Sequence, residues 1–222
     1  MKIPILLLVL LSAFGMAQPI RANTVLVLGD SLSAAYGMPE EQGWVALLEQ
    51  RLEAEKPSCT IINASISGDT TAGGRARLPQ AMARHQPDIV IIELGGNDGL
   101  RGLSLAAMQQ NLAAMIEAAQ QQPARVLLIG MQLPPNYGPR YNQQFEKVYR
   151  TLARQYDIAL LPSLVEGVGT RSDLMQNDGI HPNREAQPLI AARVWQHLQP
   201  LLAEQQQTGS AAEAGTIIAS GN

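Results

Sequence analysis

The chain has 222 residues, of which 46% are hydrophobic and 16% are charged, and its formal net charge is −3. This mildly acidic balance lacks the excess of lysine and arginine that attracts nucleic acid or anionic lipid, so it argues against both as partners. Cys59 is the only cysteine, which excludes an internal disulfide and a cysteine-based zinc site.

Residues 1–22 are typical of a secretory signal peptide. Lys2 precedes an apolar run that ends among small residues and is too short and too weakly flanked to span a membrane. We expect cleavage after Ala17 or after Ala22, and the longer leader would take two positive charges with it, Lys2 and Arg21, leaving a formal charge of −5. The pattern predicts a periplasmic or secreted protein without stable membrane insertion.

Strand and helix patterns then alternate along the chain. Apolar runs rich in β-branched residues predict five buried strands, at Thr24–Leu28, Cys59–Asn63, Asp88–Leu94, Arg125–Gly130 and Ile158–Leu161. Apolar residues three or four positions apart predict helices within Trp44–Glu55, Gly73–Arg84, Leu105–Gln121, Tyr141–Tyr156 and Glu185–Ala203. Cys59 opens the second strand, where we expect a small core residue.

This alternation predicts an α/β fold with one domain over residues 23–203. Strands that are apolar on both faces need helices on both faces, which favours a parallel five-stranded sheet in a three-layer sandwich. In such sheets ligands bind beyond the carboxyl ends of the strands, near the point where the strand order reverses. Residues 204–222 are rich in Gln, Ala, Gly and Ser with little apolar periodicity, so we expect a flexible tail there.

Polar residues suited to acyl transfer follow the first three predicted strands. Ser31 lies at the turn after the first strand, where a serine hydroxyl can serve as a nucleophile. Gly68 follows the second strand and offers a backbone N–H with no side chain in the way. Asn97 follows the third and can donate its amide, which is worth about 3 kcal/mol to a transition-state oxyanion.

The segment NDGIHP, between the fifth strand and the last helix, places Asp178 three residues before His181. Such a histidine could be a metal ligand, a general base or part of a capped turn. Asp178 can accept from one ring nitrogen if the loop folds back, which Gly179 permits and Pro182 stiffens. The other nitrogen then faces Ser31. A zinc site fits less well because neither His85 nor His197 lies near the carboxyl end of a strand.

Four motifs together resemble the signature blocks of the SGNH (GDSL) hydrolase superfamily. They are GDSL at Gly29–Leu32, the Gly68 segment, GGND at Gly95–Asp98 and DGIHP at Asp178–Pro182. The resemblance implies a flavodoxin-like αβα sandwich with Ser31 as nucleophile, His181 as base and Asp178 as its orienter. It also implies an oxyanion hole formed by the Ser31 and Gly68 amides and the Asn97 side chain. Asp30 is interpreted as a structural cap.

Three longer stretches are similar to one branch of that superfamily, the exported multifunctional enzymes known as thioesterase I, lysophospholipase or arylesterase. These stretches are GDSLSAAYG, ELGGNDGLRG and QLPPNYGPRYNQQFEKVY. The resemblance implies hydrolysis of fatty acyl thioesters, lysophospholipids and simple aryl or alkyl esters, with no cofactor or metal. Two alternatives remain: a carbohydrate O-acetyl esterase of the same superfamily and an inactive ligand-binding relative.

The segment Met131–Tyr141 follows the fourth strand and is expected to border the site. Leu100, Leu133 and Tyr137 are candidate substrate-binding residues, and Leu103 is another possible apolar wall. Ordinary packing of the loops explains these residues about equally well. We expect a monomer that binds a small-molecule acyl ester or thioester.

Overall fold

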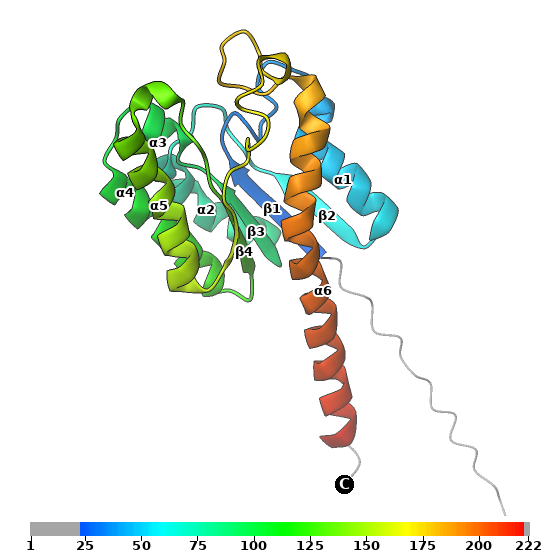
Figure 1. Cartoon of the computed structure of the whole chain (residues 1–222). Helices are drawn as coiled ribbons and strands as arrows, with labels where there is room; N and C mark the ends of the chain where they lie inside the picture. The colour runs from blue at the N-terminus through cyan, green and yellow to red at the C-terminus, as the bar shows by residue number, and fades with distance from the viewer. Residues whose placement is uncertain (1–22, 220–222) are drawn as a thin grey trace, which may run out of the picture.

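The computed structural model describes residues 23–219, with side chains as far as Ala203. The predicted signal peptide lies outside the described residues. The described chain forms a five-stranded parallel sheet in the order β2-β1-β3-β4-β5 (Figure 1). All five predicted strands are present, at β1 Asn23–Gly29, β2 Cys59–Asn63, β3 Ile89–Glu93, β4 Arg125–Ile129 and β5 Ala159–Leu161.

The two faces of the sheet build two separate apolar clusters. Because successive side chains of a strand point to opposite faces, Val25 and Val27 of β1 join one cluster, whereas Leu26 and Leu28 join the other. All four side chains are fully buried. Cys59 is also buried, as predicted. A central strand that is apolar on both faces requires helical cover on both, which gives the three-layer sandwich.

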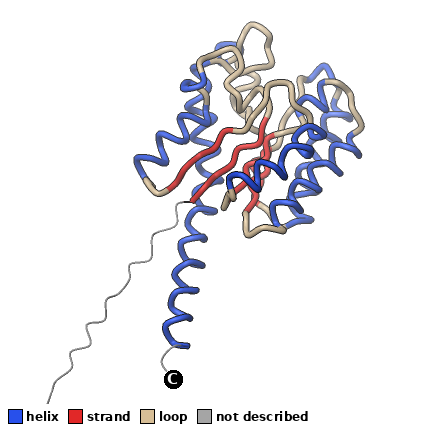
Figure 2. The backbone as a smooth tube through the Cα atoms, turned by 180° about the vertical axis from the view of Figure 1, so that it is seen from behind, coloured by secondary structure: helices blue, strands red, loops and turns tan. Residues whose placement is uncertain are grey.

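The helices divide between the two faces as Figures 1 and 2 show. Helices α1 (Trp44–Glu55) and α6 (Gln187–Ala219) pack together on one face. The other face is covered by α2 (Thr71–His85), α4 (Leu105–Gln120) and α5 (Pro139–Tyr156). One short helix, α3 (Gly96–Leu100), was not predicted. None of the helices in the described part of the chain is long and apolar enough to cross a bilayer.

Helix α6 continues beyond Ala203, where the sequence predicts the start of a flexible tail. It extends to Ala219 and projects past the sheet (Figure 1). The last buried residue of the helix among those with described side chains is Leu202. The residues that follow include Glu, Gln and Ala, which prolong an existing helix readily because the unfavourable nucleation step is already complete. The flexibility of this segment stays a prediction.

The strand order 2-1-3-4-5 is that of flavodoxin-like sheets, as expected, and it reverses direction between β1 and β3. The chain leaves β1 toward β2 on one side, and it leaves β3 toward β4 on the other. The loops after β1 and β3 therefore separate and open a crevice at the carboxyl edge of the sheet. Ser31 follows β1 and Asn97 follows β3, so both lie at this crevice.

Candidate active site

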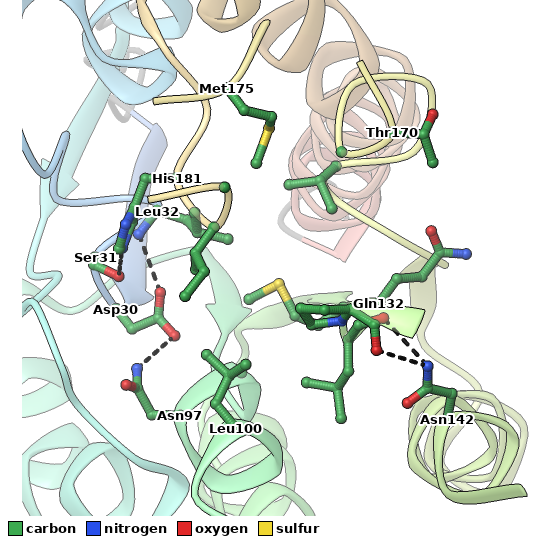
Figure 3. Close-up of a pocket in the computed structure, with 18 of the residues that line it drawn as sticks. Asp30, Ser31, Leu32, Asn97, Leu100, Gln132, Asn142, Thr170, Met175 and His181 are labelled. Atoms are coloured by element: carbon green, nitrogen blue, oxygen red, sulfur yellow. Dashed lines mark hydrogen bonds between the residues drawn. The ribbon is translucent and has the colours of Figure 1, made fainter. Parts of the chain in front are cut away.

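Ser31 lies in a tight turn that begins directly after β1. The carboxylate of Asp30 accepts a hydrogen bond from the backbone N–H of Leu32 at 3.1 Å, so Asp30 does cap the turn as the sequence predicts. The turn directs the Ser31 side chain into the crevice, where it meets His181 (Figure 3).

Asp178, His181 and Ser31 form a continuous chain of side-chain hydrogen bonds. The Nε2 atom of His181 lies 2.8 Å from the Oγ of Ser31, and its Nδ1 lies 2.6 Å from an oxygen of Asp178. With a proton on Nδ1, the imidazole can accept the Ser31 proton at Nε2. This arrangement is the one that activates a serine for nucleophilic attack.

The loop that carries Asp178 and His181 folds back on itself, as the predicted contact requires. Gly179 adopts a φ of +67°, and the N–H of Gln176 donates to the carbonyl of His181 at 2.7 Å. The other Asp178 oxygen accepts from the N–H groups of Ile180 and His181 at 2.9 and 3.0 Å. Two backbone N–H groups therefore fix one oxygen of the Asp178 carboxylate, and the other oxygen is left to hold the imidazole of His181.

These contacts keep Asp178 ionised. Partial burial acts to raise its pKa, but the N–H of His181, its imidazole and the N–H of Ile180 together lower the pKa to about 2. A carboxylate that stays charged at neutral pH can hold the Nδ1 proton of His181 and stabilise the imidazolium that forms when Ser31 loses its proton.

Gly68 and Asn97, the two predicted oxyanion donors, line the same cavity as Ser31 and His181. Gly68 has a φ of +79°, which favours glycine. Arg77 ties the Gly68 loop to the end of β1, since its guanidinium donates to Gly29 O at 3.1 Å and to Asp69 at 2.7 Å. Asn97 lies in α3, directly beside the Ser31 turn (Figure 3).

Helix α3 is anchored by one buried side chain. The carboxylate of Asp98 accepts from the N–H and the hydroxyl of Thr71 at 2.9 and 2.6 Å, which joins α3 to the start of α2. The anchor explains how a five-residue helix containing two glycines after its N-cap Gly95 holds Asn97 in place.

A cavity of about 810 Å³ opens beside Ser31 and is mainly apolar. Leu100 and Leu133 line it, as predicted, together with Met131, Val165 and Met175. Thr170 and Asn142 border the cavity at the side away from Ser31 (Figure 3). A cavity of this size and character suits a chain of methylene groups.

Tyr137 is not among the residues that line this cavity, in contrast to the prediction. Its hydroxyl donates to the carbonyl of Leu100 at 2.9 Å, so the side chain supports the cavity wall instead of forming it. Leu103 is also absent from the lining and is 45% exposed. Tyr36 lines the cavity without having been predicted, and its ring centre lies 4.5 Å from that of His181.

Comparison with known proteins agrees with this geometry. Residues 27–188, more than half of the chain, match the GDSL-like Lipase/Acylhydrolase family. The chain belongs to this family. The assignment predicted from the four motifs is therefore confirmed, and the chain is an ester and thioester hydrolase of the GDSL type.

Relatives of this GDSL hydrolase cover nearly the whole domain. It is 54% identical to esterase TesA of Pseudomonas aeruginosa over 187 residues, which are 84% of this chain and 93% of the relative. It is 46% identical to thioesterase 1/protease 1/lysophospholipase L1 of Escherichia coli K12, over 90% of this chain and 93% of the relative. It is 47% identical to an arylesterase of Vibrio mimicus, over 80% and 88%. A crystal structure of TesA superimposes with a TM-score of 0.79 at 55% identity, covering 81% of this chain and 99% of that one. The predicted branch of the superfamily is thus confirmed.

Sequence reasoning missed a buried pair of carboxyl groups beneath the turn of this GDSL hydrolase. Glu93 ends β3 opposite Gly29 of β1, and one of its oxygens accepts from the Ser33 hydroxyl at 2.6 Å and from the Asp30 N–H at 3.3 Å. Burial and the neighbouring charge of Asp30 raise the pKa of Glu93 well above its usual range. Burial also raises the pKa of Asp30, to about 6, against hydrogen bonds from Leu32 and Asn97.

These raised pKa values predict how Glu93→Gln changes thermal stability. The folded protein binds the Glu93 proton more tightly than the unfolded chain, so wild-type stability falls by about 1.4 kcal/mol per pH unit between the two pKa values. Glutamine can accept the same two hydrogen bonds without titrating. We expect the Tm of Glu93→Gln relative to wild type to rise as the pH increases above the ordinary carboxyl range of about 4, by about 2–4 °C per kcal/mol.

Thermal unfolding at a series of pH values measures this effect. Glu93→Leu is the control, because it removes the titrating group and both hydrogen bonds and is expected to lower the Tm at every pH. A difference between Glu93→Gln and wild type that stays constant with pH would contradict the assignment of a protonated, buried Glu93.

Proposed function

We propose that this GDSL hydrolase cleaves fatty acyl thioesters, lysophospholipids and simple aryl or alkyl esters through an acyl-enzyme intermediate. The observation that carries the proposal is the Asp178–His181–Ser31 hydrogen-bond chain at the mouth of an apolar cavity of about 810 Å³. The names of the relatives, esterase, thioesterase, lysophospholipase and arylesterase, support the same substrate classes.

In the proposed mechanism the Oγ of Ser31 attacks the acyl carbonyl while Nε2 of His181 takes the hydroxyl proton. Asp178 holds the Nδ1 proton of the resulting imidazolium. The negative oxygen of the tetrahedral intermediate is stabilised by the backbone N–H groups of Ser31 and Gly68 and by the Asn97 amide. His181 then gives its proton to the leaving alcohol or thiol, and the acyl group stays on Ser31. Water, deprotonated by His181, releases the fatty acid and restores the serine.

The cavity gives a physical basis for chain-length preference. Each methylene group that moves from water into an apolar site contributes about 0.8 kcal/mol, which corresponds to roughly a fourfold gain in kcat/KM. The gain ends when the chain has filled the cavity. A preference for acyl chains longer than acetyl therefore follows from an apolar wall that includes Leu100, Leu133 and Met175.

Hydrolysis of p-nitrophenyl esters from acetate to palmitate by the purified mature protein tests this function. We expect kcat/KM to rise from acetate to an optimum above four carbons and to vanish in Ser31→Ala. Turnover of acetate alone would instead indicate the carbohydrate O-acetyl esterase. Failure of an organophosphonate to label Ser31, together with no turnover, would indicate a ligand-binding protein.

We further propose that the protein acts in the periplasm or outside the cell. The support is the leader-like segment before Asn23, where β1 begins, since cleavage after Ala17 or Ala22 leaves the whole sheet intact. Amino-terminal sequencing of protein recovered from the periplasmic and culture fractions checks this. Recovery of protein that retains Met1 only from the cytoplasm would contradict it.

A further inference from the structure

The Asn97 side chain is held at both ends of its amide group. Its nitrogen donates to a carboxylate oxygen of Asp30 at 3.1 Å (Figure 3), and its oxygen faces the Arg101 guanidinium at 3.4 Å. An amide turned by 180° would place its oxygen against the carboxylate and its NH₂ group against the cation, and both contacts would be lost. The pair of neighbours therefore fixes which end of the amide faces the Ser31 turn.

One hydrogen of the Asn97 amide remains available for a substrate. The NH₂ group carries two hydrogens, and the bond to Asp30 uses one of them. Since Asn97 and Ser31 line the same cavity, the second hydrogen can serve the developing oxyanion. A donor that is already oriented stabilises the oxyanion without a reorganisation cost during the reaction.

Asp30 is itself held rigidly by the turn that carries the nucleophile. One of its oxygens accepts from the Leu32 N–H at 3.1 Å, and its own N–H donates to Glu93 at 3.3 Å. Asp30 is 2% exposed and Glu93 is fully buried. Because Asp30 directly precedes Ser31, one residue fixes both the backbone of the nucleophile and the direction of the donor.

Capping of the turn does not by itself require an ionisable side chain. Asparagine caps such turns as well as aspartate and avoids the cost of burying a carboxyl group. A carboxylate differs in that it accepts hydrogen bonds but has none to donate, so it pairs with the nitrogen of the Asn97 amide and repels its oxygen. An asparagine at position 30 accommodates either orientation of Asn97.

We propose that Asp30 is a positioning residue of the oxyanion hole, which holds the Asn97 amide in its donating orientation and acts on catalysis through Asn97. This inference rests on the proposed function, and it replaces the interpretation of Asp30 as a cap alone. The effect belongs to the transition state, so loss of Asp30 lowers kcat while KM changes little.

A double-mutant cycle tests the proposal. The variants are Asp30→Ala, Asn97→Ala and the double substitution, assayed on one p-nitrophenyl ester at its preferred chain length. We expect Asn97→Ala to lower kcat by about 10²–10³-fold and Asp30→Ala by about 10²-fold. In the Asn97→Ala background, Asp30→Ala is expected to cost about tenfold or less, because the Asn97 amide is already absent and only the cap on the Leu32 N–H is still lost.

Asp30→Asn provides the conservative member of the series. It retains an oxygen for the Leu32 N–H and so preserves the turn, and we expect a kcat loss of about tenfold, between wild type and Asp30→Ala. If Asp30→Ala fails to fold, the same cycle with Asp30→Asn decides the question. Losses from Asp30 and Asn97 substitutions that multiply in the double variant would overturn the proposal, because Asp30 would then act independently of Asn97.

The assay also separates failure of this inference from failure of the proposed function. Wild-type protein that does not hydrolyse the esters, or Ser31→Ala that retains activity, removes the proposed function and this inference with it. A wild-type enzyme that depends on Ser31 but shows multiplicative losses in the cycle removes the inference alone. Thermal unfolding of each variant identifies losses that come from unfolding.

Discussion

Ser31→Ala is expected to lower kcat for p-nitrophenyl ester hydrolysis by about 10⁴–10⁶-fold. The substitution removes the atom that lies 2.8 Å from Nε2 of His181, and no acyl-enzyme can form without it. The fold should be unaffected, because the Ser31 side chain lies at the cavity surface and its only side-chain hydrogen bond among the described residues is to His181. Steady-state kinetics measures the loss, and labelling with an organophosphonate, observed by mass spectrometry, should disappear with it.

Ser67→Ala is the matched control for this experiment. Ser67 lines the same cavity but makes no hydrogen bond to a histidine within the described part of the chain. We expect a loss of at most about tenfold, which is the scale of one altered contact in a binding site. If Ser31→Ala also loses no more than about tenfold of its activity, another residue is the nucleophile.

Asp178→Asn is expected to lower kcat by about 10⁴-fold. An asparagine amide that faces Nδ1 donates a hydrogen, which forces the imidazole proton onto Nε2. In that tautomer His181 has no lone pair for the Ser31 proton. The lowered pKa of Asp178 means that its charge favours the folded state, so the free energy of unfolding should fall, but only modestly because the side chain is 38% exposed. Kinetics and thermal unfolding measured together distinguish the two effects.

Asp173→Asn gives the comparison for this loss. Asp173 lies in the short 3-10 helix Ser172–Leu174, is exposed, and pairs with Arg171. The same change of charge five positions before Asp178 is expected to alter kcat less than twofold, because surface pairs contribute little. Equal losses in the two variants would mean that Asp178 acts through the general electrostatic field and not by orienting His181.

The strands and most helices could be predicted because their signals are local. The run IVIIE of β3 is fully buried, and strand length and composition alone indicate such a segment. Helix α3 could not be predicted, because GNDGL has low intrinsic helix propensity and is stabilised by the distant contact from Asp98 to Thr71. The extension of α6 was missed because its composition resembles that of a linker.

Some residues of the candidate site could likewise be predicted from the sequence, and others could not. Ser31, Gly68, Asn97 and the Asp178–His181 pair each follow a strand, so their convergence at one edge follows from the parallel sheet. The role of Glu93 depends on the register that places it opposite Gly29, which no local pattern reports. The same holds for Tyr137, whose hydroxyl is turned toward Leu100 by the fold of the loop after β4.

The hydrogen bond between Ser31 and His181 joins residues 150 positions apart, one after the first strand and the other after the last. Synthesis of the chain from its amino terminus completes all five strands of the sheet before Asp178 and His181 are added. Ser31 therefore has no base beside it until the loop after β5 docks and brings His181 to its hydroxyl. During refolding, the rate at which an organophosphonate captures Ser31 reports the arrival of this final segment, separately from the collapse of the core.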